Sequence, residues 1–541
     1  MDKKDSEKLG ADDVFWADQI AKKVIEREKR LNRNVDVYRT EMGLGASGIP
    51  HVGSAGDGIR SYVVALALQE LGYRSELIAF SDNRDGLRKV PVGFPASLRK
   101  DIGKPVSMID DPFGCHKSFG DHVSSLLIDA FEKIGVKYRL QTGDDAYRRG
   151  LLDNEIIEIL KNAQQAGKII FNMTNQDKYT KQLPFLPVCE KCGRIYTTRA
   201  YKFLPDEKKI LYKCDASFVG KDSNTGEEII VKGCGHEGEC SIRDGKLSWK
   251  VEFAARWRAL RINYEAYGKD IADSVAVNDE ICRQILGWEP PVHSFYELFV
   301  ERGGGKISKS KGNVFTPQTW LKYGNKESIR LLFLKRLGTT RVVDLQEIPK
   351  YMEEVDGLSK IYYNEDKRLI KKLSNKELAH AKRLYEYVYF LNPEKPAIVI
   401  PYRLLVGFVK LVKDKNIVKD ILRKTGHVPE KMSPQEEKEL DRRIEYAMKW
   451  VEDALGEEKK IEITERQRKA LRSLAEQLQP GITEEELYSK FFEIAKANNI
   501  DVKKFFAGAY AALLGSDRGP RLAPLIIAIG VEKVKNILES V

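Results

Sequence analysis

Two short stretches of the sequence carry residue types that bind phosphate groups. Residues 303–313 read GGGKISKSKGN, so Lys306, Ser308 and Lys309 follow directly on three glycines. Ammonium and hydroxyl groups on a mobile glycine-rich loop can close over phosphate oxygens and stabilise developing charge. The same composition is typical of a solvent-exposed turn, because Gly, Ser, Asn and Lys all favour such turns. Evidence elsewhere in the chain must decide between these two interpretations.

A second candidate lies in the glycine-rich loop MGLGASGIPHVGSAGDG at residues 42–58. The glycines that match the G-x-G-x-x-G pattern of dinucleotide-binding folds are Gly43, Gly45 and Gly48. Two features disfavour that function. Pro50 delays the helix beyond the third glycine, and the acidic residue of the next strand, Asp82, lies 34 residues after Gly48 instead of about 20.

The alternative is that residues 51–54, HVGS, open the helix. His51 would then lie at a helix N-terminus, where exposed N–H groups and the helix dipole favour phosphate. Gly53 has no side chain, so a nucleotide can approach the backbone there. This pattern predicts a site for nucleotide phosphates.

Cysteines indicate a separate metal site. Of the seven cysteines, five lie between Cys189 and Cys240. The ligands predicted for one structural Zn²⁺ are Cys189, Cys192, Cys214 and Cys234, which begin with a C-x-x-C turn. His236 and Cys240 are competing ligands, and unmetallated thiols are the alternative to any metal. Cys115 and Cys282 are expected to be isolated structural thiols.

These residues require elements that position them. Residues 35–40 and 76–82 have the composition of strands, and apolar residues recur at helical spacing between them, from Ile59 to Ala67. This β-loop-α-β unit predicts a doubly wound parallel sheet, with ligands at the carboxyl ends of its strands. The acidic pairs Asp82 with Asp85, and Asp110 with Asp111, fit either substrate contacts or solvated loops.

The C-terminal part differs in pattern. From about residue 376 the chain is expected to be helical. Ser433 with Glu436, and Thr483 with Glu486, have the spacing of capping boxes, each followed by an apolar helical stripe. These patterns together predict an α/β fold: a doubly wound parallel sheet with a small zinc-stapled insertion, followed by a helical C-terminal part.

Composition limits the function classes. The sequence contains no apolar run of the roughly 20 residues that a membrane span needs, and its charged N-terminus is not typical of a secretory signal. We therefore expect a cytoplasmic protein without a membrane partner. A formal net charge of +11 suits a polyanionic partner, with solubility as the alternative explanation.

The two phosphate-binding candidates together carry a resemblance. HVGS and KISKS, about 255 residues apart, are similar to the paired HIGH and KMSKS signatures of class I aminoacyl-tRNA synthetases. Longer stretches, including FSDNRDGLRKVP, DDPFGCHKSFGDH, ARWRALRINYEAYGKD and SDRGPRLAPLI, resemble the class I lysyl-tRNA synthetases of archaea and some bacteria. The similarity runs from about residue 15 to the end. On this resemblance the lysine-rich stretch is interpreted as a catalytic loop.

The resemblance assigns roles to individual residues. Those expected in catalysis are His51, Gly53, Lys306, Ser308 and Lys309. Those expected to bind ATP are His51, Gly53, Ser54, Asp270, Lys306 and Lys309. Those expected to line a lysine pocket are Gly43, Gly45, Trp257 and Tyr296. The sequence departs from the family pattern at four positions. Some members have threonine in place of Gly45 and histidine in place of Ile271. Ser54 ends the first signature instead of histidine or asparagine, and Ile307 replaces the methionine of the second.

The resemblance implies an α/β fold class: a Rossmann-type parallel-sheet catalytic domain with a zinc-knuckle insertion, followed by an all-α C-terminal domain. It also implies a division of the chain and a reaction. The catalytic domain is expected in two halves, residues 1–95 and 249–310. Between them, residues 96–248 are expected to form an insertion with the zinc module at 185–245. Residues 311–375 are expected to form a stem-contact region, and residues 376–541 an anticodon-binding domain. The implied activity is ligation of L-lysine to tRNA(Lys) through a lysyl-adenylate, using ATP and Mg²⁺, by a monomer. The alternatives are a class I synthetase for another amino acid and a non-catalytic tRNA-binding relative.

Overall fold

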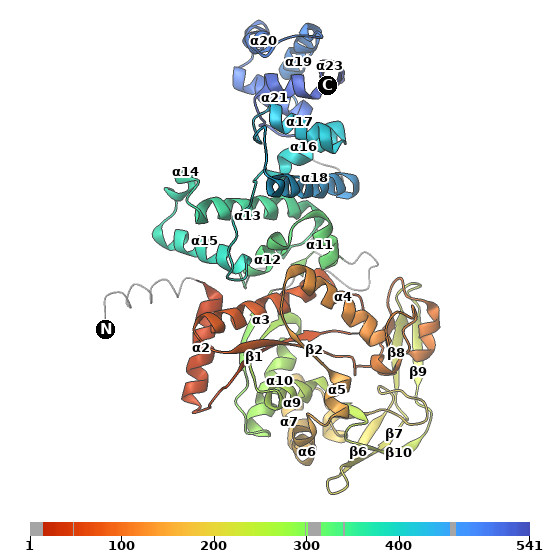
Figure 1. Ribbon diagram of the computed structural model, residues 1–541. Helices are drawn as coiled ribbons and strands as arrows, with labels where there is room; N and C mark the ends of the chain where they lie inside the picture. The colour runs from red at the N-terminus through yellow and green to blue at the C-terminus, as the bar shows by residue number, and fades with distance from the viewer. Residues whose placement is uncertain (1–14, 47, 298, 301–314, 339–340, 455–460) are drawn as a thin grey trace, which may run out of the picture. The chain divides into compact units, whose positions relative to one another are not determined.

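The computed structural model describes residues 15–46, 48–297, 299–300, 315–338, 341–454 and 461–541 (Figure 1). Lys306, Ser308 and Lys309 lie outside the described residues. The chain divides into two compact units. The first contains Met1–Thr319, Ile329–Asp344 and Arg368–Pro393, and the second contains Trp320–Ser328, Leu345–Lys367 and Glu394–Val541. The finer division expected from the sequence stays a prediction.

A five-stranded parallel sheet forms the centre of the first unit. Its strands are β1 (Tyr38–Leu44), β2 (Ser75–Ser81), β4 (Arg139–Thr142), β12 (Ile262–Gly268) and β13 (Val292–Tyr296). They lie in the order β13-β12-β1-β2-β4, and every neighbouring pair is parallel. The predicted doubly wound sheet is confirmed. The chain leaves β1 in one direction and returns to β12 on its other side, so the switch point where ligands bind lies between β1 and β12.

Helices cover both faces of this sheet (Figure 1). On one side lie α3 (Val52–Glu70) and α4 (Phe119–Ile134), and on the other lie α9 (Trp249–Ala259) and α10 (Ala272–Gln284). Met42 points to the α3 face, because a Cβ on Gly58 of α3 would lie 2.6 Å from its sulfur. Side chains alternate along a strand, so Glu41 and Gly43 face α9 instead.

The remaining helices of the first unit are α2 (Trp16–Arg30), α5 (Gly143–Arg148), α6 (Asp153–Lys161), α7 (Ala163–Thr174), α8 (Lys178–Lys181) and α15 (Asn375–Val388). A large apolar core joins the α9 side of the sheet to α5, α6, α7 and α10. Two neighbouring elements, α11 (Pro317–Tyr323) and α12 (Lys326–Leu334), each have residues in both units.

Short strands build the insertion between β4 and α9, together with β3 (Lys89–Val90). They are β5 (Phe185–Pro187), β6 (Arg199–Leu204), β7 (Lys209–Lys213), β8 (Ser217–Asp222), β9 (Glu228–Lys232), β10 (Glu237–Ser241) and β11 (Gly245–Leu247). They form the small sheets β10-β7-β6, β3-β8-β9 and β11-β5. A further pair, β14 (Phe299–Val300) with β15 (Arg341–Val342), lies later in the chain.

Late segments complete the first unit. Arg383 of α15 forms an ion pair with Asp18 of α2, with Nη2 2.7 Å from Oδ1, across 365 positions of sequence. Arg330 donates from Nε to the carbonyl of Ile134 at 2.9 Å and from Nη1 to the carbonyl of Val388, also at 2.9 Å. The N-terminal helix and the end of α4 therefore depend on residues that follow much later in the chain.

The second unit is helical in its described part. Its main helices are α13 (Ile348–Tyr362), α16 (Tyr402–Val412), α17 (Lys415–Lys424), α18 (Pro434–Ala454), α19 (Glu465–Gln477), α20 (Glu484–Ala497), α21 (Val502–Leu514), α22 (Leu522–Ile529) and α23 (Val531–Glu539), with the short α14 (Lys367–Ile370) at its border with the first unit. Both predicted capping boxes are present, since Glu436 N donates to Ser433 Oγ and Glu486 N donates to Thr483 Oγ1, each at 3.3 Å. Among the described helices of both units, none combines the length and apolarity needed to span a bilayer.

Candidate active site

The N-terminus of α3 opens at the carboxyl end of β1. His51 is the N-cap residue, with extended backbone dihedrals, and the first turn of the helix contains no acidic residue. Gly53 is buried and Ser54 is half-buried, and the amide of Ser54 donates to the carbonyl of His51 at 2.9 Å. The helix start predicted from the sequence is confirmed, although the preceding strand begins at Tyr38 instead of residue 35. A helix start whose first turn has no carboxylate favours an anion.

Asp270 and Tyr296 meet at the ends of β12 and β13. Gly268 pairs in register with Tyr296, and a Cβ on Gly268 would lie 2.7 Å from Asp270 Oδ1 and 3.4 Å from the Tyr296 hydroxyl. Arg60 of α3 stacks on the Tyr296 ring, with its guanidinium carbon 4.1 Å from the ring centre. Residues expected at the ATP ribose and at the lysine pocket therefore lie side by side.

Trp257 lies on the opposite side of the sheet from Tyr296. Its ring is fully buried in α9, and its Nε1 donates to Glu265 Oε2 at 2.5 Å. Glu265 is three residues before Gly268, so the alternation along β12 places its side chain on the other face. The structure does not bring together the two aromatic residues expected to form one wall of the lysine pocket. Gly43 is the last residue but one of β1, and the exposed Gly45 directly follows that strand.

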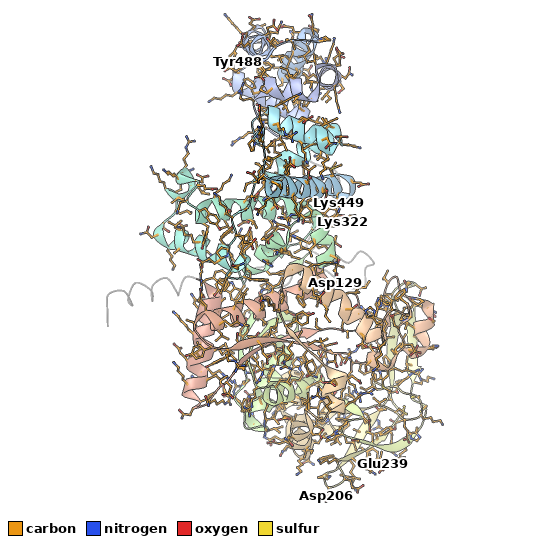
Figure 2. All side chains as sticks on the ribbon, in the orientation of Figure 1. Asp129, Asp206, Glu239, Lys322, Lys449 and Tyr488 are labelled. Atoms are coloured by element: carbon orange, nitrogen blue, oxygen red, sulfur yellow. The ribbon has the colours of Figure 1, made fainter. Side chains whose placement is uncertain are left out.

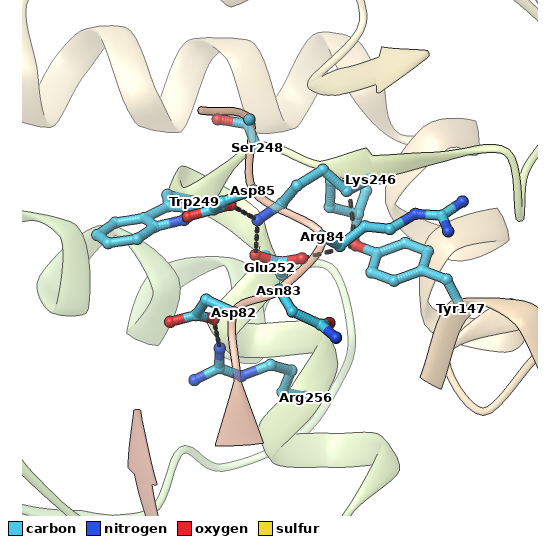
Figure 3. A network of polar contacts seen from close by, with 12 residues as sticks. Asp82, Asn83, Arg84, Asp85, Tyr147, Lys246, Ser248, Trp249, Glu252 and Arg256 are labelled. Carbon is cyan, nitrogen blue, oxygen red and sulfur yellow. Dashed lines mark hydrogen bonds and ion pairs between the residues drawn. The ribbon is translucent and has the colours of Figure 1, made fainter. Parts of the chain in front are cut away.

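A network of buried charges fills the space between the sheet and α9 (Figure 3). Arg256 forms ion pairs with Glu41 at 2.6 Å and Asp82 at 2.9 Å, and its guanidinium lies 3.9 Å from Glu265. Burial raises the pKa of Glu41 and Glu265, and it raises the pKa of Asp82 to about 7 although Arg256 opposes the shift. The site therefore contains more carboxylate than its one guanidinium can neutralise.

The network continues toward the insertion. Lys246 lies between Asp85 and Glu252, with its ammonium 2.7 Å from Glu252 Oε2, and the Tyr147 hydroxyl donates to Glu252 Oε1 at 2.8 Å. Sequence reasoning treated Asp82 and Asp85 as possible solvated loop residues, whereas Asp82 is only 8% exposed. It missed Glu41 and Glu265 altogether. The available signal was a glutamate within each of the short runs that form β1 and β12.

Four cysteines converge in the insertion. The ligand atoms of Cys189, Cys192, Cys214 and Cys234 all lie within 4.8 Å of one another. The Sγ atoms of Cys189 and Cys234 are 3.7 Å apart, as are those of Cys192 and Cys214. A tetrahedron with Zn–S bonds of about 2.3 Å has edges of about 3.8 Å, so the donor set fits Zn²⁺. Of the competing ligands, His236 contacts Glu190 through Nε2 at 2.6 Å and is not part of this group, nor is Cys240.

A second group of metal-ligand residues lies just before α4 and in its first turn. The ligand atoms of Asp111, Cys115, His116 and His122 also lie within 4.8 Å of one another. Cys115 Sγ is 3.2 Å from Asp111 Oδ2 and 3.2 Å from Nδ1 of each histidine. The expectation that Cys115 is isolated is wrong. The signal in the sequence was the local run DDPFGCHKSFGDH, which mixes three ligand types instead of repeating C-x-x-C.

The C-terminal helices carry an open cavity of about 970 Å³. Its aromatic lining residues are Tyr488, Phe491, Phe506 and Tyr510, and its charged ones are Glu484, Glu485 and Arg521. Tyr488 is 59% exposed on α20 and is labelled on these C-terminal helices in Figure 2. Exposed aromatic rings beside charged groups provide stacking and hydrogen-bonding partners for an unpaired nucleic-acid base.

Comparison with known proteins agrees with these observations. The family described as "tRNA synthetases class I (K)" matches residues 14–389, and an "Anticodon binding domain" family matches residues 438–540. A lysine–tRNA ligase of Cenarchaeum symbiosum (strain A) is 41% identical over 97% of this chain and 98% of its own length. A lysine–tRNA ligase of Rickettsia prowazekii (strain Madrid E) is 30% identical over 97% of this chain and 96% of its own length. The family resemblance drawn from the signature stretches is confirmed, and the chain belongs to the class I tRNA synthetases, enzymes that ligate amino acids to tRNA.

Proposed function

We propose that the enzyme ligates L-lysine to tRNA(Lys) through a lysyl-adenylate intermediate, releasing pyrophosphate and AMP. The observation that carries this proposal is the near full-length similarity, at 41% identity, to a protein named as a lysine–tRNA ligase. The anion-binding start of α3, beside a parallel-sheet switch point, supports the ATP-dependent step. The expected cytoplasmic location and monomeric state stay predictions.

The first step joins lysine to AMP. A carboxylate oxygen of lysine attacks the α-phosphorus of ATP, an O–P bond forms, and the bond to the β-phosphate oxygen breaks with its electrons passing to pyrophosphate. Such an in-line displacement needs alignment and charge stabilisation and no protein nucleophile. His51 and the amides at the start of α3 are proposed to hold phosphate oxygens, and Asp270 the ribose. Lys306 and Lys309, outside the described residues, are proposed to stabilise the leaving pyrophosphate, and bound Mg²⁺ would neutralise phosphate charge.

The second step transfers lysine to tRNA. A ribose hydroxyl of the terminal nucleotide attacks the acyl carbon of the adenylate, and AMP leaves with the electrons of the broken acyl–phosphate bond. The aromatic cavity of α20–α22 is proposed to bind bases of the anticodon. Arg521 already pairs with Glu484 there, with Nη2 2.9 Å from Oε2, so the cavity offers both a donor and an acceptor to a base edge.

A screen of the twenty amino acids in ATP–pyrophosphate exchange tests the proposal. Assays with and without tRNA are both needed, because some class I synthetases activate their amino acid only with tRNA bound. Exchange with lysine, followed by lysyl-tRNA formation, is the expected result. Exchange with a different amino acid would establish the alternative specificity, and no exchange with any amino acid would support a non-catalytic tRNA-binding relative.

Both groups of metal ligands are proposed to hold structural Zn²⁺. The all-thiolate group and the mixed Asp, Cys and His group each supply four donors of the types that zinc prefers. Neither group lies among the residues proposed for catalysis, so the ions would stabilise local structure. Metal analysis of Cys189→Ser and His122→Ala, against Cys282→Ser as the matched control, separates the sites. Each of the first two variants should lose one equivalent of zinc and the control none, and a wild type that contains no zinc would contradict the proposal.

A further inference from the structure

A cavity of about 290 Å³ lies at the amino ends of β1 and β12, within the first unit. Arg39 is the second residue of β1, and Arg261 directly precedes β12. His51 lies beyond the opposite, carboxyl end of β1, which is about 16 Å from Arg39 at the usual rise of a strand. The cavity is therefore separate from the candidate active site, and its volume suits a small ligand.

Guanidinium groups dominate the lining of this cavity. Arg33, Arg39 and Arg261 all contribute to it. Arg39 pairs with Glu76, with Nε 2.8 Å from Oε1, whereas the side chains of Arg33 and Arg261 donate no hydrogen bond within the described part of the chain. Arg27 nearby has a structural role, because it donates to two backbone carbonyls. Arg33 and Arg261 therefore keep their N–H groups for a ligand.

Positive charge in the lining is not balanced by acids. Glu28, 1% exposed, forms its close ion pair with Arg27, and Arg33 lies 3.8 Å from its other oxygen. Asp36, the other acid of the lining, is exposed and forms no ion pair among the described residues. Burial lowers the pKa of Arg33, and burial together with the charge of Arg33 lowers the pKa of Arg27 to about 10. A bound anion would compensate these guanidiniums.

Arg261 occupies a backbone position that favours glycine. It directly follows Leu260, the C-cap of α9, has a φ of +54°, and donates its amide to the carbonyl of Arg258 at 3.2 Å. Glycine is the usual residue at such a position, because a Cβ is disfavoured in the left-handed region. An arginine here costs some stability, and it places a long cationic side chain at the cavity.

Asn263 lies at a bulge between β1 and β12. The register shifts by one residue after Arg39, so Asn263 is left without a partner on β1. Its Oδ1 accepts from the Arg39 amide at 2.7 Å, and its Nδ2 donates to no described group, although the residue is only 5% exposed. Bulges reorient side chains, and this one adds a further donor to the lining of the cavity.

A phosphate monoester matches this lining best. It carries a charge of about −1.5 to −2 at pH 7 and three acceptor oxygens, whereas a carboxylate has a single charge and two oxygens. Guanidiniums bind phosphate oxygens in pairs, and that of Arg33 is oriented by the Trp288 ring, whose centre lies 3.5 Å from the guanidinium carbon. The phosphodiesters of RNA carry one charge each and belong to a polymer that a cavity of about 290 Å³ cannot enclose.

We propose that this cavity binds a small phosphorylated molecule, with Arg33, Arg261 and Asn263 donating to its phosphate oxygens. The ligand would join the chain after α2, the end of α9 and the first residues of two neighbouring strands. Its binding should therefore raise the thermal stability of the enzyme without competing with ATP. The inference does not depend on which amino acid the enzyme activates.

Isothermal titration calorimetry of the full chain with glycerol 3-phosphate tests the inference. Glycerol is the neutral control ligand, and lactate is the carboxylate control. The wild type should bind one equivalent of glycerol 3-phosphate, about tenfold or more tightly than lactate, and should not bind glycerol. Arg33→Gln and Arg261→Gln should each weaken this binding about tenfold or more. Arg199→Gln, which removes a half-exposed cation of the insertion, is the matched control and should not weaken it.

His51→Ala separates this cavity from the ATP site, because it should retain full affinity for glycerol 3-phosphate. Loss of binding in His51→Ala would place the phosphate in the ATP site and overturn the inference. No binding to the wild type, or equal affinities of the wild type and Arg261→Gln, would overturn it too. Displacement of glycerol 3-phosphate by tRNA would assign the guanidiniums to an RNA backbone instead. If Arg33→Gln fails to fold, Arg261→Gln decides alone, because that side chain is exposed.

Discussion

The two faces of the parallel sheet are held by different forces. On the α3 face, Gly58 lets the helix approach so closely that Met42 and Phe131 fill the space where a side chain would stand. On the α9 face, Arg256 and the carboxylates of Glu41 and Asp82 add buried charge beside the apolar core that packs there. Both faces meet at the switch point between β1 and β12.

This difference indicates a division of tasks. Close packing at Gly58 holds α3 against the sheet, and the first turn of this helix contains no acidic residue, which suits a site for anionic phosphates. Buried carboxylates cost stability but distinguish a cation from a neutral group of the same size. We therefore expect changes at the start of α3 to affect reactions of phosphate groups, and changes to the buried charges of the α9 face to affect stability.

The largest effect is expected from removing the central cation of the α9 face. Arg256→Met leaves three buried carboxylates without their guanidinium, and breaking a buried ion pair from one side costs about 3–5 kcal/mol. Urea unfolding at pH 7 measures the loss. Arg199→Met, which removes a half-exposed partner of Asp215, should change the midpoint little. Equal urea midpoints for the two variants would mean that the buried ion pairs of Arg256 stabilise the fold no more than the exposed pair of Arg199.

A somewhat smaller effect, on rate and not on stability, is expected on the α3 face. His51→Ala should slow adenylate formation by about 10²-fold, close to 2.7 kcal/mol, the usual result of losing one positioned donor. Single-turnover assays report this step directly. His427→Ala, a change in the helical unit where the imidazole contacts Thr425 at 3.0 Å, should leave the rate unchanged. Lys309→Ala is expected to resemble His51→Ala, and a normal rate in both would remove these groups from the mechanism.

Packing on the α3 face can be tested with a single methyl group. A Cβ on Gly58 would lie 2.5 Å from the Phe131 ring and 2.6 Å from the Met42 sulfur, so Gly58→Ala should destabilise by about 1–3 kcal/mol. Gly357→Ala in α13 is the matched control, because no atom lies within 4 Å of its added Cβ, and it should stabilise by up to about 1 kcal/mol through helix propensity. A Gly58→Ala variant more stable than the wild type would show that an added methyl group fits between α3 and the side chains of Met42 and Phe131.

The smallest effect is expected from one hydroxyl group on the α3 face. Tyr296→Phe should raise the KM for lysine several-fold, or about 1 kcal/mol, and leave the KM for ATP nearly unchanged. Steady-state exchange assays measure both constants. Equal changes in the two KM values, or a loss of stability with neither KM changed, would mean that Tyr296 belongs to the core.

The structure could be predicted from the sequence wherever a local pattern determines it. The start of α3 at His51 follows from Pro50 and the glycines around it, and the four clustered cysteines follow from the spacing typical of thiolate ligands. The capping boxes at Ser433 and Thr483 are equally local. Each of these features depends on residues close in sequence or on one strongly marked residue type.

Features that depend on distant pairing were not predictable in the same way. The separation of Trp257 from Tyr296 depends on the register of β12 and β13, which no single stretch reveals. Glu41 was overlooked because its partner Arg256 lies far away in the chain. The ligand group around Asp111 was missed for another reason, since a mixed set of Asp, Cys and His has no repeated spacing.

The pairing of Asp18 with Arg383 has a consequence for synthesis of the chain. Asp18 leaves the ribosome 365 positions before its partner. At translation rates of about 5–20 residues per second, the N-terminal helix waits about 20–70 s for that contact. The parallel-sheet unit, which also needs Arg330 and the carbonyl of Val388 to close over the end of α4, can be completed only after α15 has been made. During that interval the nascent sheet exposes the surface that these late segments cover, and a truncation before Arg368 would leave it permanently unfinished.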